Sequence, residues 1–281
     1  MTLALPDDVA DAIVRIDTPP DVEVHVRPGL TGELATLSSW WQRLAGDAPV
    51  VAAHVVVDPH DAMPDTAPGG NDCARALSVG LAAANRAIDS GATLLVPGSG
   101  PGPMWDGRVR PADPASPVDP AGPDDDVRAR ALIGLLTKRD ASSVLGQPLG
   151  MPDGVWMDEC ARIRDTMAEH RALLGEQLSL LDAVDGHAIA VTAGALIGAA
   201  ARRTPCLIDG TSAWAAALVA DRIAHRARHW WRAASTSTDP AWTAARDRTD
   251  IPAGLPLGLD HDGWGARVTI ALLEMIQDGR A

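Results

Sequence analysis

The densest group of ionisable side chains in this 281-residue chain stands in the segment LDHDGWGA. Here Asp260, His261 and Asp262 precede a Gly-x-Gly turn formed by Gly263 and Gly265. Two carboxylates beside an imidazole are suited to general acid–base catalysis, because a positioned carboxylate can remove a proton from a reacting group. The structural alternative is a solvated turn that leads into the last helix. A metal ion would need further ligands from distant segments, so the spacing predicts no metal site.

Asp209, Gly210 and Thr211 directly follow a short apolar run at residues 205–208. A carboxylate and a hydroxyl at the end of a buried strand could orient a ligand there. The alternative is a purely local role, in which Asp209 or Thr211 caps a helix that begins near Ser212.

A cluster of hydroxyl side chains, residues 235–238, follows a second apolar run at residues 229–234. Its hydroxyls, including that of Ser237, could hydrogen-bond phosphate oxygens at the N-terminus of the next helix. Asp239 followed by Pro240 offers the alternative of an ordinary helix cap with proline at the first helical position.

A glycine-rich loop follows the apolar run at residues 92–98 and contains Gly98, Ser99, Gly100 and Gly102. Backbone N–H groups of such a loop could cradle a phosphate. The loop matches neither a dinucleotide-binding fingerprint nor a P-loop with its lysine, so a flexible turn stays open as an alternative. The proline-rich stretch that continues to residue 126 predicts either a lid or a disordered insertion.

Hydrophobic patterning predicts the elements that must position these loops. The apolar runs predict four strands, at residues 49–58, 92–98, 205–208 and 229–234. Helices are predicted at about residues 6–16, 32–44, 73–90, 127–140, 155–174, 240–248 and 266–277, with an apolar turn at 178–184. Two further helices, rich in small residues, are predicted on either side of the run at 205–208, and the second begins near Ser212. In the last helix, Val268, Leu272, Met275 and Ile276 are expected to point inward, and Thr31 is expected to cap the helix that starts near Gly32. Alternating strands and helices predict an α/β fold with a parallel sheet, whose ligands lie where strand ends meet loops.

Net charge, cysteine spacing and apolar runs limit the partners and the cellular compartment that we expect for this chain. A formal net charge of −13 argues against nucleic acid or an anionic membrane as the main partner, without excluding a local phosphate site. The cysteines Cys73, Cys160 and Cys206 have no zinc spacing and indicate unreactive thiols of a reducing compartment. His187 lies early in an apolar helix and is interpreted as a core histidine. The N-terminal segment lacks the pattern of a signal peptide, and no apolar run reaches about 20 residues, so we expect a cytoplasmic protein.

Several segments together resemble the nicotinate-nucleotide–dimethylbenzimidazole phosphoribosyltransferases. The resemblance is carried, in order, by RPGLTGEL, VVVDPHDA, LLTKRDASSVLGQPLG, DGHAIAVTAGA, PCLIDGT, ASTSTDPAW and HDGWGA. These correspond to the family's elements PPGSLGRLE, ADHG, LTGRDP with VVGRGTG, GGFEIAAMAGA, PVVLDGF, SHRSAEPGH and LGEGTGA. The similarity covers most of the chain, with a shortened segment after the ADHG-like strand.

The resemblance implies a three-layer, Rossmann-like α/β fold with helices on both sheet faces. It also implies a single domain over residues 1–281, with accessory helices at about 1–46 and 264–281, a core at about 47–263 and a proline-rich insertion at 101–126. A homodimer is implied, with no metal and no organic cofactor.

The resemblance further implies phosphoribosyl transfer from nicotinate mononucleotide to an aromatic base in the synthesis of the cobalamin lower ligand. Asp262 takes the position of the family's catalytic base, and Gly263 and Gly265 belong to the same loop. Ser237 and the glycine-rich loop would hold the phosphate, while Asp209 and Gly210 form the strand-end turn.

The departures from the family pattern concern the site. Asp262 is one methylene shorter than the family's Glu, and Ser99 stands where the phosphate loop has a Glu. Glu159 falls near the position of a phosphate-contacting Lys, and Ala188 replaces the Glu of the GGFEIA element. These changes leave a second hypothesis open, in which the chain binds a nucleotide, a base or a partner protein without turnover.

Overall fold

The computed structural model describes residues 4–24, 29–55, 72–98, 123–147, 151–259 and 263–279. Its centre is a four-stranded parallel sheet with the strand order β1-β2-β3-β4. The strands are β1 (Ala52–Val55), β2 (Leu94–Pro97), β3 (Cys206–Ile208) and β4 (Trp231–Ala233). Each lies inside an apolar run that predicts a strand, so the α/β class and the parallel sheet are confirmed. Residues 56–58 of the first predicted strand lie outside the described residues.

The helices, in chain order, are α1 (Asp7–Val14), α2 (Gly32–Ala45), α4 (Asp72–Asp89), α5 (Pro123–Thr137), α6 (Ala141–Leu145), α7 (Asp153–His170), α8 (Gln177–Ala183), α9 (His187–Ala201), α10 (Thr211–Ile223), α11 (Pro240–Thr249) and α12 (Trp264–Asp278). Two 3-10 helices, η1 (Arg171–Leu173) and η2 (His225–Trp230), complete the described elements.

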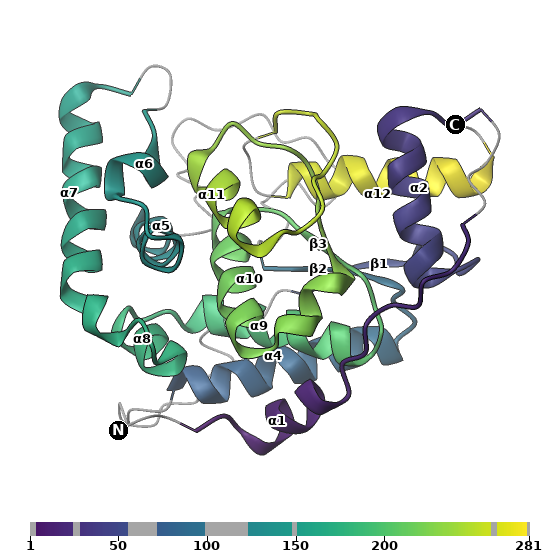
Figure 1. Cartoon of the computed structure of the whole chain (residues 1–281), viewed down its shortest axis with the longest axis horizontal. Helices are drawn as coiled ribbons and strands as arrows, with labels where there is room; N and C mark the ends of the chain where they lie inside the picture. Colours follow the sequence, from purple (N-terminus) through teal and green to yellow (C-terminus); the bar gives the residue numbers. More distant parts are fainter. Residues whose placement is uncertain are drawn as a thin grey trace.

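One face of the sheet is covered by α4, α9 and α10, whose many alanines let helices approach closely (Figure 1). The contact between α4 and α9 depends on glycines. A Cβ built on Gly80 would lie 1.8 Å from the Val191 carbonyl oxygen, and one on Gly194 would lie 2.0 Å from that of Leu77. Since no side chain fits at these distances, the two helix backbones touch directly. The helix α1 packs against the same layer through Val9.

The opposite face is covered by α2 and α12, which lie together in Figure 1. Their apolar side chains enclose Leu94, Val96 and Leu207 of the sheet. Helices therefore cover both faces, and the three-layer architecture is confirmed. The exact division into a core and an accessory unit of terminal helices stays a prediction.

The helices α5, α6, α7 and α8 lie together on one side of the molecule, at the left of Figure 1. The chain enters α5 after β2 and returns from α8 through α9 to β3. Side-chain contacts described below connect α5 to the loop that follows β4. This helical group therefore stands near the carboxyl ends of the strands, where the predicted site loops begin.

Three local predictions are wrong. The apolar turn predicted at 178–184 is instead helix α8 up to Ala183, because Leu178, Leu180 and Leu181 are buried by tertiary contacts that the short run does not reveal. The proline-rich stretch gives way to helix at Pro123 rather than after residue 126, consistent with proline being tolerated in the first turn of a helix. Thr31 occupies the N-cap position of α2, yet its side chain forms no capping hydrogen bond.

The inward face of α12 is also displaced from the predicted one. The helix buries Ala266, Thr269, Ile270, Leu273 and Ile276, whereas Met275 is 43% exposed. Of the residues predicted to point inward, Ile276 is buried and Val268 and Leu272 are half-buried. The buried positions recur every three to four residues from Ala266. Ala266 itself packs against the sheet, so the inward face starts there.

Candidate functional site at the carboxyl ends of the strands

Asp209, the first residue after β3, connects the sheet to α12. Its side chain is 1% exposed, and Oδ2 accepts a hydrogen bond of 2.8 Å from the backbone N–H of Ala266. Ala266 lies in the first turn of α12, whose N-cap residue, Gly263, has no side chain to cap it. Asp209 therefore supplies from a distant strand the oxygen that a local cap would provide. Its negative charge is also favoured near the positive end of the helix dipole.

The alternative in which Asp209 or Thr211 caps α10 is wrong, because no side chain forms a capping hydrogen bond at the N-terminus of that helix. Thr211 Oγ1 instead accepts a hydrogen bond of 3.0 Å from the indole Nε1 of Trp242 in α11. Both polar groups at the end of β3 are thus held by elements that follow much later in the chain.

Gly265 is the point where the ends of β3, β4 and α12 meet. A Cβ built on it would lie 2.6 Å from Ser235 Oγ and 3.2 Å from Asp209 Oδ1. Ser235 follows β4 and is buried, and its backbone forms a parallel bridge with Leu255. The Gly-x-Gly spacing therefore serves a close approach between the last helix and the two strand ends.

Gly98 and Gly210 begin the loops after β2 and β3, and both have a backbone conformation that residues with a side chain rarely adopt. Their φ angles are +106° and +96°, in the region that favours glycine. A Cβ on Gly98 would lie 3.2 Å from Thr192 of α9 and 3.3 Å from Ala213 of α10. Since α10 starts directly after Gly210, the two glycines stand next to the same first helical turn.

The loop between β4 and α11 has a capping function. Asp239 Oδ1 accepts a hydrogen bond of 2.8 Å from Ala241 N, so the local alternative is confirmed for Asp239. Ser237 Oγ accepts a hydrogen bond of 2.9 Å from the backbone N–H of Asp239. Ser237 is half-buried, and its hydroxyl helps to fix the loop that presents it.

Arg130 on α5 is a residue of this region that the sequence patterns do not identify. Its guanidinium donates to both carboxylate oxygens of Asp239, at 3.1 and 2.7 Å. It also donates to Asp126 Oδ2 at 2.6 Å and to the Val144 carbonyl oxygen at 2.8 Å. Two carboxylates thus compensate one buried cation. The signal in the sequence is an arginine inside the apolar helix VRARALIGLL, since such a residue needs a partner when it is buried.

Several predicted site residues, namely Asp262, Ser99, Gly100 and Gly102, lie outside the described residues. Gly263, which follows Asp262 by one peptide bond, has a φ of +83°.

Several titratable groups have pKa values that are shifted by burial. Burial raises the pKa of the Cys206 thiol, and burial together with the carboxylate of Asp182 raises that of Cys73. Burial, followed by the charge of Arg267, lowers the pKa of His54 on β1. These shifts favour the neutral forms, as expected for interior groups.

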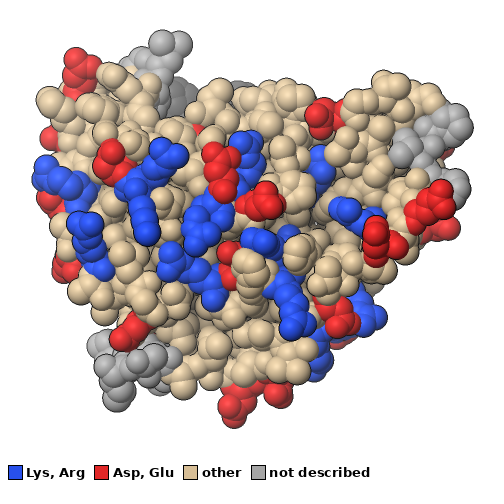
Figure 2. Space-filling model, in the orientation of Figure 1, with Lys and Arg blue, Asp and Glu red and all other residues tan. Residues whose placement is uncertain are grey.

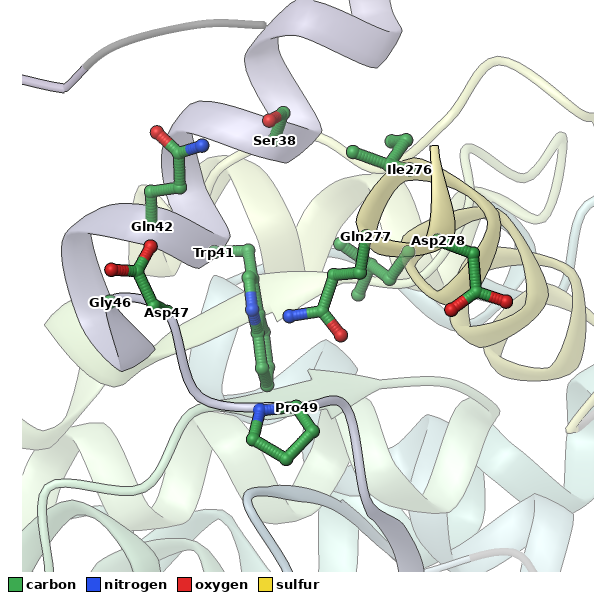
Figure 3. Close-up of a pocket in the computed structure, with 10 residues that line it drawn as sticks. Ser38, Trp41, Gln42, Gly46, Asp47, Pro49, Ile276, Gln277 and Asp278 are labelled. Carbon is green, nitrogen blue, oxygen red and sulfur yellow. The ribbon is translucent and has the colours of Figure 1, made fainter. Parts of the chain in front are cut away.

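A cavity of about 460 Å³ lies between α2, the segment that precedes β1 and the end of α12 (Figure 3). It is lined by Trp41 and Gln42 of α2, by Pro49 before β1, and by Ile276 and Gln277 near the end of α12. Gln277 closes part of it by accepting from Val50 N at 2.7 Å and donating to the Ala48 carbonyl oxygen at 2.6 Å. Ligands of parallel sheets bind at the carboxyl ends of the strands, so this cavity is not the candidate site.

The surface charge is unevenly distributed despite the net charge of −13. Figure 2 shows Lys and Arg side chains gathered across the middle of one face, among fewer acidic ones, in the region where Figure 1 places α10 and α11. Within the described part of the chain, no helix is long and apolar enough to cross a membrane.

Residues 124–277, more than half of the chain, match the family model described as phosphoribosyltransferase. The chain belongs to the nicotinate-nucleotide–dimethylbenzimidazole phosphoribosyltransferase family. The matched region begins in α5 and contains Arg130, Asp209, Ser237 and the first turn of α12. The resemblance stated from the sequence is thereby confirmed.

The curated relatives of this chain carry the name of the family. The chain is 41% identical over 148 residues to the nicotinate-nucleotide–dimethylbenzimidazole phosphoribosyltransferase of Streptomyces avermitilis, covering 52% of this chain and 40% of the relative. It is 30% identical over 234 residues to that of Corynebacterium glutamicum, covering 83% and 58%. The chain therefore spans about half the length of the curated relatives it matches.

A solved structure supports the fold. The crystal structure of the phosphoribosyltransferase of the same name from Thermus thermophilus is similar with a TM-score of 0.62 and 20% sequence identity. The similarity covers 98% of this chain and 95% of that chain. At this level of identity the comparison confirms the architecture alone.

Proposed function

We propose that this chain transfers the phosphoribosyl group of nicotinate mononucleotide to an aromatic base of the dimethylbenzimidazole class, in the synthesis of the cobalamin lower ligand. Family membership supports the reaction class, and the names of the relatives support the substrate pair. The site is proposed at the carboxyl ends of β2, β3 and β4, where the matched family region contributes its strand-end loops.

The observation that carries the proposal is the bond between Asp209 and the N-terminus of α12. This buried contact of 2.8 Å holds the first turn of α12, which closely follows Asp262 in the sequence, at the end of β3. Gly265 permits the approach, since a side chain there would collide with Ser235. We infer that the carboxylate of Asp262, which precedes this helix turn in the sequence, acts as the general base of the reaction, a role that requires a defined position.

In the proposed reaction, the carboxylate of Asp262 accepts the N–H proton of the acceptor base. A ring nitrogen of that base then forms a bond to C1 of the ribose. The bond between C1 and the pyridinium nitrogen of nicotinate mononucleotide breaks, and its electron pair stays on the nitrogen, so that nicotinate leaves. The pyridinium charge is lost as the new bond forms, and no oxidant or reductant is consumed.

The phosphate is assigned to the loops that begin at Gly98 and contain Ser237. Backbone N–H groups of Ser99, Gly100 and Gly102 and the Ser237 hydroxyl are suitable donors for phosphate oxygens, whereas the Gly98 N–H already donates to the Val55 carbonyl oxygen at 3.3 Å. Glu159, near the position of the family's lysine, is compensated by Arg162, whose Nη1 lies 3.0 Å from Glu159 Oε1. Local repulsion of a phosphate is reduced accordingly.

The test is an assay of the purified protein with nicotinate mononucleotide and dimethylbenzimidazole, in which released nicotinate is followed by chromatography. Asp262→Asn and Asp262→Ala should abolish release, because neither side chain accepts the proton. Asp262→Glu restores the family's longer side chain and should raise the rate, by up to roughly 100-fold if a displacement of about 1 Å limits the present one. Wild-type release no greater than that of Asp262→Ala contradicts the proposal.

Thermal shift with each substrate separates failed chemistry from failed binding. A ligand that binds the native state must raise the melting temperature. Shifts with both substrates but no nicotinate release would favour the binding-only hypothesis over transfer. The homodimer that the family resemblance implies is tested by light scattering coupled to gel filtration.

A further inference from the structure

We propose that Cys73, Asp182 and His187 form a binding site for Zn²⁺ where α4, α8 and α9 converge. The three side chains each offer one ligand atom, and these atoms all lie within 4.8 Å of one another. Cys73 is in the first turn of α4, Asp182 is in the last turn of α8, and His187 begins α9. Figure 1 shows α8 beside α4 and α9.

The distances fit a site that closes around a cation. Ligand atoms at about 2.0–2.3 Å from a tetrahedral Zn²⁺ are roughly 3.3–3.8 Å apart. Side-chain rotations that move each atom by about 1 Å would therefore bring these three within binding distance of one ion. A thiolate, an imidazole and a carboxylate are ligands that Zn²⁺ accepts, and a softer set than Mg²⁺ or Ca²⁺ prefers. Three protein ligands leave a fourth position for water.

Asp182 is held in a position to bind a cation. Its Oδ1 accepts a hydrogen bond of 2.7 Å from the backbone N–H of Cys73. Its Oδ2 is buried, and the Asp182 carboxylate is within hydrogen-bonding reach of the Cys73 thiol. A cation bound between the Cys73 sulfur and Asp182 would take the place of the thiol proton.

His187 has the support that zinc-binding histidines require. Its Nδ1 lies 2.8 Å from Asp185 Oδ1, an arrangement that places the proton on Nδ1 and the lone pair on Nε2. Asp185 is fixed in turn by Arg128, whose Nη2 lies 2.9 Å from Asp185 Oδ2. The His187 side chain is 21% exposed, which gives the ion a path from solvent.

The local charge favours a bound cation, because the carboxylates of Asp182 and Asp185 lie directly beside Cys73 and His187.

The experiment is a titration of the metal-free protein with Co²⁺, a spectroscopic substitute for Zn²⁺, followed by metal analysis of the zinc-loaded protein. We expect one ion per chain and a near-ultraviolet charge-transfer band from thiolate to cobalt. Cys73→Ser should abolish the band and His187→Ala should abolish stoichiometric binding, whereas the matched control Cys160→Ser should retain both. Zn²⁺ should raise the melting temperature of the wild type and of Cys160→Ser only.

Asp185→Asn keeps the proposal testable if a ligand variant does not fold. Asp185 has a φ of +54°, which asparagine tolerates, and its side chain is 60% exposed. Loss of the orienting carboxylate should weaken cobalt binding about 10- to 100-fold. Absence of the charge-transfer band in folded wild-type protein, or wild-type affinity in both His187→Ala and Asp185→Asn, would overturn the proposal.

Discussion

At the scale of single residues, the buried carboxylate of Asp209 has the clearest structural role. It is one of few acidic side chains in the interior of the described region, and its oxygen replaces the cap that Gly263 cannot provide. This side chain therefore helps to position α12 relative to β3, together with the apolar packing of α12 on the sheet.

We expect Asp209→Ala to destabilise the protein by about 1.5–3 kcal/mol, the range for a hydrogen bond to a charged group whose loss leaves a buried donor unsatisfied. Denaturant unfolding measures the change. Asp11→Ala, an exposed acidic position on α1, is the matched control and should stay within about 0.5 kcal/mol of wild type. Equal stabilities of the two variants would contradict the capping role.

At the scale of elements, glycines decide how closely the helices on one sheet face pack. The α4 and α9 backbones approach until no side chain fits at Gly80 or Gly194. The chain is rich in glycine throughout, so composition alone does not distinguish these two positions from glycines in turns. Only the contact itself identifies them as packing glycines.

Gly80→Ala should destabilise the protein by about 1–3 kcal/mol or more, because its Cβ would force the helices apart. Gly154→Ala on α7 is the control: no atom lies within 4 Å of its added Cβ, so the substitution should be neutral or stabilise by up to about 1 kcal/mol. Thermal and denaturant unfolding compare the two. Similar losses for both would mean that the α4–α9 contact is not close.

At the scale of the whole molecule, the half-buried imidazole of His54 couples folding to pH. Burial, and then the charge of Arg267, lowers the pKa of His54. The unfolded chain takes up a proton near the ordinary histidine value of 6.5, whereas the folded chain does so only at lower pH. The unfolded state thus binds more protons in this window, and the stability that His54 contributes is lost as pH falls below about 6.5.

The free energy of unfolding should therefore decrease between pH 7 and about pH 5, and His54→Gln should flatten this dependence. His229, whose pKa burial and then Arg228 lower, should leave a smaller residual slope in that variant. Denaturant unfolding at a series of pH values tests this. A second decline near the acid limit belongs to Asp140, whose pKa the hydrogen bonds from Ser142 and Ser143 lower to about 2.

Much of the fold is predictable from the sequence, because local patterning has local causes. The apolar runs around β2, β3 and β4 and the Asp239-Pro240 cap of α11 are read from neighbouring residues. Predictions fail where distant contacts decide. Residues 178–183 become helix because other elements bury them, and the inward face of α12 is the one that packs against the sheet, next to its contact with Asp209.

The sequence by itself determined the α/β class, the order of the elements and the family, since periodicity and ordered motifs survive without coordinates. The tertiary structure alone decided that Asp209 caps a helix 57 residues away and that Arg130 binds an aspartate 109 residues away. It also brought Asp182 to Cys73 across 109 residues, where linear spacing predicts no metal site. The physical reason is the same in each case: buried polar atoms need partners, and folding, rather than proximity in the chain, provides them.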